Sequence, residues 1–219
     1  MRGDVAEWLG RGLQSLVQRF ESARRLLLLG LVLAVTGCAA GSEHASPPTM
    51  PDAEQLVAHL SDLPVGFNLN LAESFPVPTS TILADPWQAG SAGTVRRERL
   101  SGYQASFTSP RAVRLQCSTA VYRTSAAARK VYRLRMTGAG SFVTELGGRS
   151  RPVAEIGDET DAHRFDIGPA HYLGVAWRFR NVLSTCVAAR FTASPMADIL
   201  VCARAQQARI ARVLGRGRR

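Results

Sequence analysis

Regular alternation of apolar and polar residues between positions 103 and 121 constrains the fold of this chain more than any other sequence feature. Tyr103, Ala105 and Phe107 alternate with polar residues, and a second stretch repeats the pattern from Val113 to Val121. Successive side chains of a strand point to opposite faces of a sheet. The pattern therefore predicts two half-buried strands.

Helical and strand patterns flank these two stretches. The period of apolar residues predicts a first helix over 52–63, a helix that opens at Thr124-Ser125, and a final helix that starts at Pro195. Residues 68–94 contain three prolines and are expected to form a long, partly irregular loop with a short helix at 79–86. Further strands are expected at 141–145, 161–167, 172–177 and 182–191, with a hairpin turn at Arg180-Asn181. This order predicts an α+β fold with helices packed on one face of an antiparallel β-sheet.

The N-terminal region has the features of an export signal. Arg24-Arg25 precedes an apolar run from Leu26 to Val35, which is too short to cross a bilayer as a helix. Val35-Thr36-Gly37-Cys38 then resembles the bacterial lipobox, in which small residues admit the signal peptidase and the cysteine thiol takes a diacylglyceryl group. We therefore expect a cleaved signal segment over 1–37 and an acyl anchor, such as palmitate, on Cys38.

This interpretation places one domain outside the membrane. Residues 38–51 are small, polar and proline-containing, so they predict a flexible tether. A single domain over 52–215 and a basic tail at 216–219 follow. The expected location is the extracytoplasmic face of the cell membrane. An ordinary signal peptide with a coincidental cysteine, or a retained membrane helix, remains the alternative.

Residues 1–23 do not fit a signal peptide. The strings Asp4 to Trp8 and Arg19 to Ser22 are similar to the conceptual translation of the two conserved arms of a transfer-RNA gene, in the same order. This similarity predicts that translation starts after Ser22, near Arg24. The alternative is an amphipathic helix with Val5, Trp8 and Leu9 on one side.

The charge of the chain is strongly positive, but it carries little information about nucleic acid. The net charge is +10, and Lys130 is the one lysine among 27 basic residues. Arginine in this proportion reflects a GC-rich coding bias. No basic motif with interleaved aromatic residues is present, so we expect no nucleic-acid partner. A basic surface of this kind could approach anionic lipid headgroups or acidic polymers, or simply be solvated.

Three cysteines remain once Cys38 is acylated. Export implies an oxidising compartment, so a disulfide is expected among Cys117, Cys186 and Cys202. Cys186–Cys202 ranks first because a strand often packs against the helix that follows it. Cys117–Cys186 ranks second, since it requires neighbouring strands, and Cys117–Cys202 ranks third.

Few residues suggest chemistry. Asp158, Glu159 and Asp161, with His163 and Asp166, form the densest acidic patch, but their spacing matches no calcium loop and is typical of a turn. No phosphate loop, dinucleotide fingerprint, nucleophile elbow or HExxH motif occurs. We therefore expect no metal, no cofactor and no catalytic residue. A catalytic thiol served by His163 or His171 is the remaining alternative.

Four short segments carry a family resemblance over roughly 100–212. They begin at Tyr122, Glu155, Trp177 and Ala205, and they resemble actinobacterial exported lipoproteins of unknown function, some of which have a fold like PsbP and Mog1. The resemblance implies an envelope lipoprotein and supplies no catalytic residues. We expect a lipid-anchored binding or interaction module, not an enzyme, for an apolar or lipid-like ligand or an envelope protein. The alternative is an exported, hydrolase-like enzyme.

Overall fold

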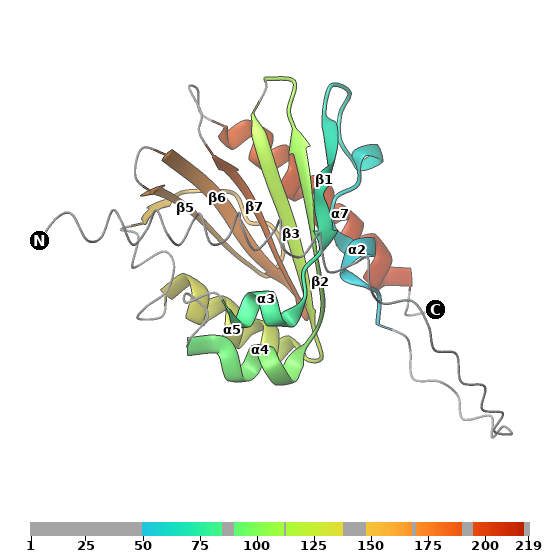
Figure 1. Ribbon diagram of the computed structural model, residues 1–219, viewed down its shortest axis with the longest axis vertical. Coiled ribbons are helices and arrows are strands. Elements are labelled where there is room, and N and C mark those ends of the chain that lie inside the picture. The colour runs from blue at the N-terminus through green and yellow to red at the C-terminus, as the bar shows by residue number, and fades with distance from the viewer. Residues whose placement is uncertain are drawn as a thin grey trace, which may run out of the picture. The chain divides into compact units, whose positions relative to one another are not determined.

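Within the part of the chain that the structure describes, a seven-stranded antiparallel sheet has the order β1-β2-β3-β7-β6-β5-β4 (Figure 1). This computed structural model describes residues 50–84, 90–111, 113–137, 148–167, 170–189 and 195–216. They belong to one compact unit, Pro48–Arg219. The strands are β1 Asn68–Pro76, β2 Arg99–Thr108, β3 Arg114–Tyr122, β4 Arg149–Arg151, β5 Glu159–Ile167, β6 Ala170–Phe179 and β7 Val182–Ala189.

One face of the sheet, here called the α7 face, carries the larger core. α7 Met196–Arg216 and the short α2 Ala53–Leu56 pack on it. The largest buried side chains here are Phe107, Leu115 and Trp177 from the strands and Ile199 from α7. They come from alternate positions of β2, β3 and β6, so the predicted strand period is confirmed.

The opposite face, here called the α5 face, is covered at one end. α3 Thr79–Leu83, α4 Ala92–Glu98 and α5 Ser125–Thr137 lie together there (Figure 1). Their core includes Tyr122, Ala176 and Leu183, whose strand neighbours Trp177 and Val182 point to the α7 face. The α+β class and the antiparallel sheet are as predicted, whereas the expectation of helices on one face is wrong. At this end the strands carry apolar side chains on both faces of the sheet, so helices cover both faces.

The predicted first helix is broken into two pieces. α2 ends at Leu56, and the 3-10 turn η1 Leu60–Asp62 follows it. Between them Val57 is extended, with φ −69° and ψ 154°, and the Ala58 N–H donates to Gln206 of α7. Burial of this segment against α7 therefore takes precedence over the helical period of its sequence.

The expected loop over 68–94 contains two regular elements besides α3. β1 is an edge strand with an irregularity between Asn70 and Phe75, and α4 leads directly into β2. An edge strand tolerates polar residues and a terminal proline, which is why its sequence resembles a loop. The strand expected at 141–145 lies outside the described residues.

Candidate functional site

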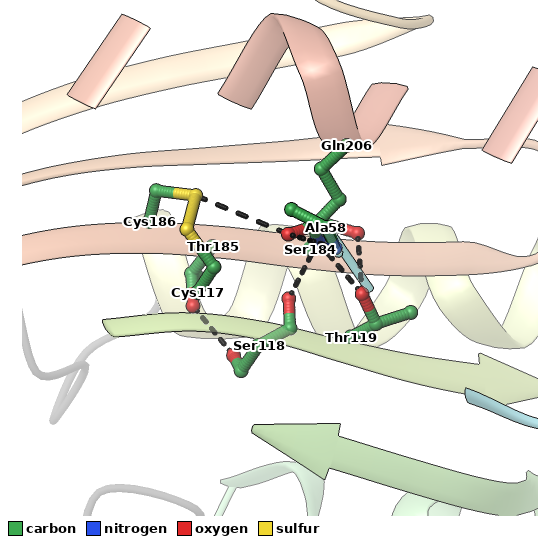
Figure 2. Close-up of a disulfide and its surroundings, with 8 residues drawn as sticks. All are labelled: Ala58, Cys117, Ser118, Thr119, Ser184, Thr185, Cys186 and Gln206. Atoms are coloured by element: carbon green, nitrogen blue, oxygen red, sulfur yellow. Dashed lines mark hydrogen bonds between the residues drawn. A yellow bond between two sulfur atoms is a disulfide. The ribbon is translucent and has the colours of Figure 1, made fainter. Parts of the chain in front are cut away.

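A disulfide joins the two central strands of the sheet. Cys117 of β3 and Cys186 of β7 are direct cross-strand partners, with Cα atoms 4.1 Å apart, and their side chains enter the α7 face (Figure 2). The first-ranked pairing, Cys186–Cys202, is therefore wrong, and the second-ranked pairing is present. β7 lies beside β3 in the sheet although the two cysteines are 69 positions apart, and this neighbourhood was not evident from sequence order.

Cys202 is a free thiol at the centre of the same core. Its side chain is fully buried on α7, one turn before Gln206. Burial raises the pKa of Cys202 to about 12, and the negative charge of Asp198 adds to the effect. The thiol therefore stays protonated and behaves as a small apolar side chain.

Gln206 is the polar centre of the α7 face (Figure 2). It is fully buried, and its Nε2 donates to the Ser118 carbonyl at 3.0 Å and to Thr119 Oγ1 at 2.7 Å. Its Oε1 accepts from the Ala58 N–H at 3.4 Å and lies 4.0 Å from Cys186 Sγ. One amide thus connects α7, β3 and the segment after α2. Gln206 lies at helical spacing from Ile199, Ala203 and Ile210, and nothing in that pattern indicates this role.

The acidic patch is occupied by arginine. The side chain of Arg178 is 3% exposed, and its guanidinium contacts Asp158 at 2.8 Å and Glu159 at 2.9 Å. Burial alone would raise the pKa of Glu159, but hydrogen bonds and charge from Arg178 and Arg129 lower it overall. These carboxylates therefore fix β5 to β6 and α5. In the sequence, the signal for these ion pairs was Arg178, a charged residue within the apolar stretch 172–179.

Asp161 and His163 lie next along β5 on the α5 face. The Tyr132 hydroxyl of α5 donates to Asp161 at 2.6 Å, and burial together with this bond raises the pKa of Tyr132. Both ring nitrogens of His163 are buried and have no hydrogen-bond partner among the described residues. Burial lowers the pKa of His163, although Asp161 opposes the shift. The imidazole is therefore neutral at physiological pH.

Beyond α5 the same sheet face has no described helix over it (Figure 1). Paired residues of β2, β3 and β7, and of β5, β6 and β7, form rows of side chains across the strands there. Most of these side chains are half-buried or exposed. The Ser118 and Thr185 hydroxyls share a hydrogen bond of 2.7 Å between β3 and β7. We call this surface the distal half-face, and its residues are Gln104, Gln116, Ser118, His163, Gly174, Thr185 and Val187.

Several predicted features fall elsewhere. Cys38, with the signal segment and tether, lies outside the described residues, and so does the side chain of Asp166. His171 is the second residue of β6 and is exposed, whereas Cys202 is buried on α7. Among described residues, no group of three metal-ligating side chains converges, and no helix is long and apolar enough to cross a membrane.

Comparison with known proteins gives a loose structural likeness but no family. No family model and no curated protein matches the chain. The extracellular domain of PknH from Mycobacterium tuberculosis is similar in structure, with a TM-score of 0.40 and 10% sequence identity. The match covers 72% of this chain and 94% of the PknH domain.

Proposed function

We propose that this chain is an exported, lipid-anchored binding module of the cell envelope, and that it is not an enzyme. The Cys117–Cys186 disulfide is the observation that carries the proposal. Disulfides form and persist in oxidising compartments, so the bond supports export. The lipobox-like segment that ends at Cys38 supplies both the export route and the anchor.

The binding surface in this proposal is the distal half-face. It lies on a sheet whose central strands are covalently joined from the opposite side, so its backbone is held in a fixed shape. Gly174 sits within this surface, opposite Val187 on one side and His163 on the other. A glycine inside a strand often marks a place where another backbone or a ligand approaches closely.

The chemistry of this surface favours a protein partner over an apolar ligand. Gln116 is exposed, Gln104 is half-buried, and the Ser118–Thr185 pair adds two hydroxyls. Val187 supplies a small apolar contact among them. Amides and hydroxyls around a small apolar centre suit hydrogen bonding to a polypeptide, and interfaces of this kind are commonly polar. A segment of another envelope protein is the proposed ligand.

The surroundings of the acidic residues and of the Cys202 thiol support a binding function without catalysis. Asp158 and Glu159 are bound by Arg178, and Asp161 accepts from Tyr132. Cys202 is buried as a neutral thiol. Asp158, Glu159, Asp161 and Cys202 thus have structural roles, and burial keeps His163 neutral.

The anchor is tested by metabolic labelling with a palmitate analogue. The wild-type chain should take up the label, and Cys38→Ala should lose it. Cys202→Ala is the matched control, because it also removes a cysteine but leaves the lipobox intact. Label on Cys38→Ala would show that the anchor is wrongly placed.

The binding surface is tested by crosslinking in cells. A photoreactive residue in place of Gln116 should give a discrete protein adduct, whereas the same residue in place of exposed Arg204 on α7 should not. Identical adducts at both positions, or none at Gln116, would contradict this surface. A lipid-sized mass addition at Gln116 would instead identify the apolar ligand class.

A further inference from the structure

The chain enters the domain at one particular end of the sheet. The Ala53 N–H donates to Ser101 Oγ at 3.0 Å, and α2 packs against Val121 and Val182. These residues lie where β2 begins, β3 ends and β7 begins. We call this the entry end. The first described residues of the domain therefore lie at this end of the sheet.

The helices α4 and α5 lie at the same end (Figure 1). α4 runs directly into the start of β2, and α5 begins three residues after the end of β3. The Arg123 N–H donates to the Glu98 carbonyl at 2.8 Å, so the turn after β3 is joined to the last turn of α4. The two helices also contact each other and form one continuous outer surface.

The exposed side chains of this surface are predominantly basic. Arg96 and Arg97 project from α4, Arg123 lies in the turn, and Lys130 lies on the outer face of α5. None of these four, which we call the entry-end patch, forms an ion pair with a described residue. The neighbouring Arg129 and Arg133 are more than half exposed, and both pair with Glu159.

A buried arginine adds to the positive charge beneath the patch. Arg99 is 8% exposed, and its guanidinium donates to Val77 O at 2.7 Å and Thr79 Oγ1 at 3.1 Å, with no carboxylate partner in the described structure. Burial lowers the pKa of Arg99, and the charge of Arg135 on α5 lowers it further. On the other layer, by contrast, Arg209 and Arg212 are both paired with Asp62.

We propose that the entry-end patch docks on the anionic lipid headgroups of the membrane that holds the anchor. The proposal rests on the lipid anchor of the proposed function. Residues 38–51 can extend at most about 50 Å, so an anchored domain stays close to the bilayer. Tethering makes the contact effectively intramolecular, and weak electrostatic binding then suffices. Each basic side chain near an anionic surface strengthens binding by roughly fivefold.

The test uses residues 48–219, which form a compact unit with their own core and lack Cys38. The domain should cosediment with vesicles containing phosphatidylglycerol and not with vesicles of phosphatidylcholine alone, and salt should weaken the binding. Arg96→Glu, Arg97→Glu and Lys130→Glu together should reduce binding at least about tenfold. The glutamine equivalents should give a smaller loss in the same direction, and circular dichroism should confirm that each variant is folded.

The matched control reverses three exposed arginines elsewhere, Arg149, Arg151 and Arg204. This control has the same net charge as the patch variant and should retain most of the binding. Equal losses in both variants, or no binding of the wild-type domain to anionic vesicles, would overturn the proposal. Patch-dependent binding to dextran sulfate that is tighter than binding to vesicles would assign the patch to an acidic polymer. Failure of the palmitate label leaves these results unchanged, so the two proposals fail separately.

Discussion

Gln206 and Arg178 are buried polar side chains, and each is stabilised by partners that the tertiary structure supplies. The Gln206 amide has hydrogen-bond partners from two other segments of the chain. The Arg178 guanidinium has two carboxylates and the Arg180 carbonyl. A buried polar group without partners costs about 1–3 kcal/mol or more, so the satisfaction of these two groups fixes how the layers meet. Cys202 and His163 differ from Gln206 and Arg178, because burial favours the neutral thiol and the neutral imidazole.

Cys202 should resist alkylation in the native protein. Its pKa of about 12 and full burial leave almost no reactive thiolate, even at mildly alkaline pH. In residues 48–219, iodoacetamide should add no mass to the native, non-reduced domain and one adduct after unfolding in denaturant. Rapid modification of the native domain, located at Cys202 by peptide mapping, would contradict the buried position.

His163 should make the domain less stable in mild acid. Its folded pKa lies below the unfolded value because burial disfavours the imidazolium, so the unfolded state binds more protons near its pKa of about 6.5. Stability should therefore fall as the pH drops through about 6.5 towards the lowered folded pKa. His163→Gln should flatten this part of the curve of unfolding free energy against pH, measured by urea denaturation. An unchanged slope would show that His163 does not contribute.

At the scale of elements, the pairing of β3 with β7 organises the sheet. β7 returns from the β6 hairpin, whose turn contains Arg180 at φ 54°, and then lies between β6 and β3. This pairing closes a long segment of chain and brings Cys117 opposite Cys186. The disulfide therefore reinforces the connection between the N-terminal strands and the C-terminal hairpin.

Removal of this disulfide should destabilise the domain strongly. The chain-entropy model gives a loss of about 4 kcal/mol for a bridge with a sequence separation of 69. Cys117→Ala with Cys186→Ala should lower the free energy of unfolding by roughly 2–5 kcal/mol in urea titrations. Cys202→Ala is the control, and it should leave the disulfide intact in non-reducing peptide maps. Loss of the bridge in Cys202→Ala would indicate the alternative pairing.

At the scale of the whole molecule, residues from both termini of the described domain share one core. Ala53 and Leu56 from α2 pack with Ile210 from α7, and Arg209 and Arg212 pair with Asp62. The two ends of the domain are therefore fixed to each other on the α7 face. Separate unfolding of either end would expose this shared core.

Residues 48–219 should consequently unfold in one cooperative step. Calorimetry should give a single transition, with a van't Hoff enthalpy close to the calorimetric enthalpy. Truncation before α7, at Pro195, should abolish that transition, because the chain would lose Ile199, Cys202 and Gln206 from the centre of the α7 face. A truncated domain that still melts cooperatively would show that α7 is not integral to the core.

The sequence by itself determined the local elements and the class of fold. Alternation in β2 and β3, the helical period of α5 and α7, and the turn at Arg180-Asn181 were all visible, because each depends on neighbouring residues. The Cys117–Cys186 pairing depends on which strands are neighbours, and the sequence did not show that β3 pairs with β7, so this pairing was ranked second. The edge strand β1 and the helix α4 lacked a strong period, so they were missed.

Only the tertiary structure decided how distant segments meet. The strand order places β7 between β3 and β6, and this order selects Cys186 as the partner of Cys117. It also puts helices on both sheet faces at the entry end and leaves the distal half-face without a described helix. These outcomes depend on contacts between residues far apart in the chain. One arrangement is favoured because it buries both sheet faces and gives Gln206 and Arg178 their hydrogen-bond partners. No local sequence pattern shows these contacts.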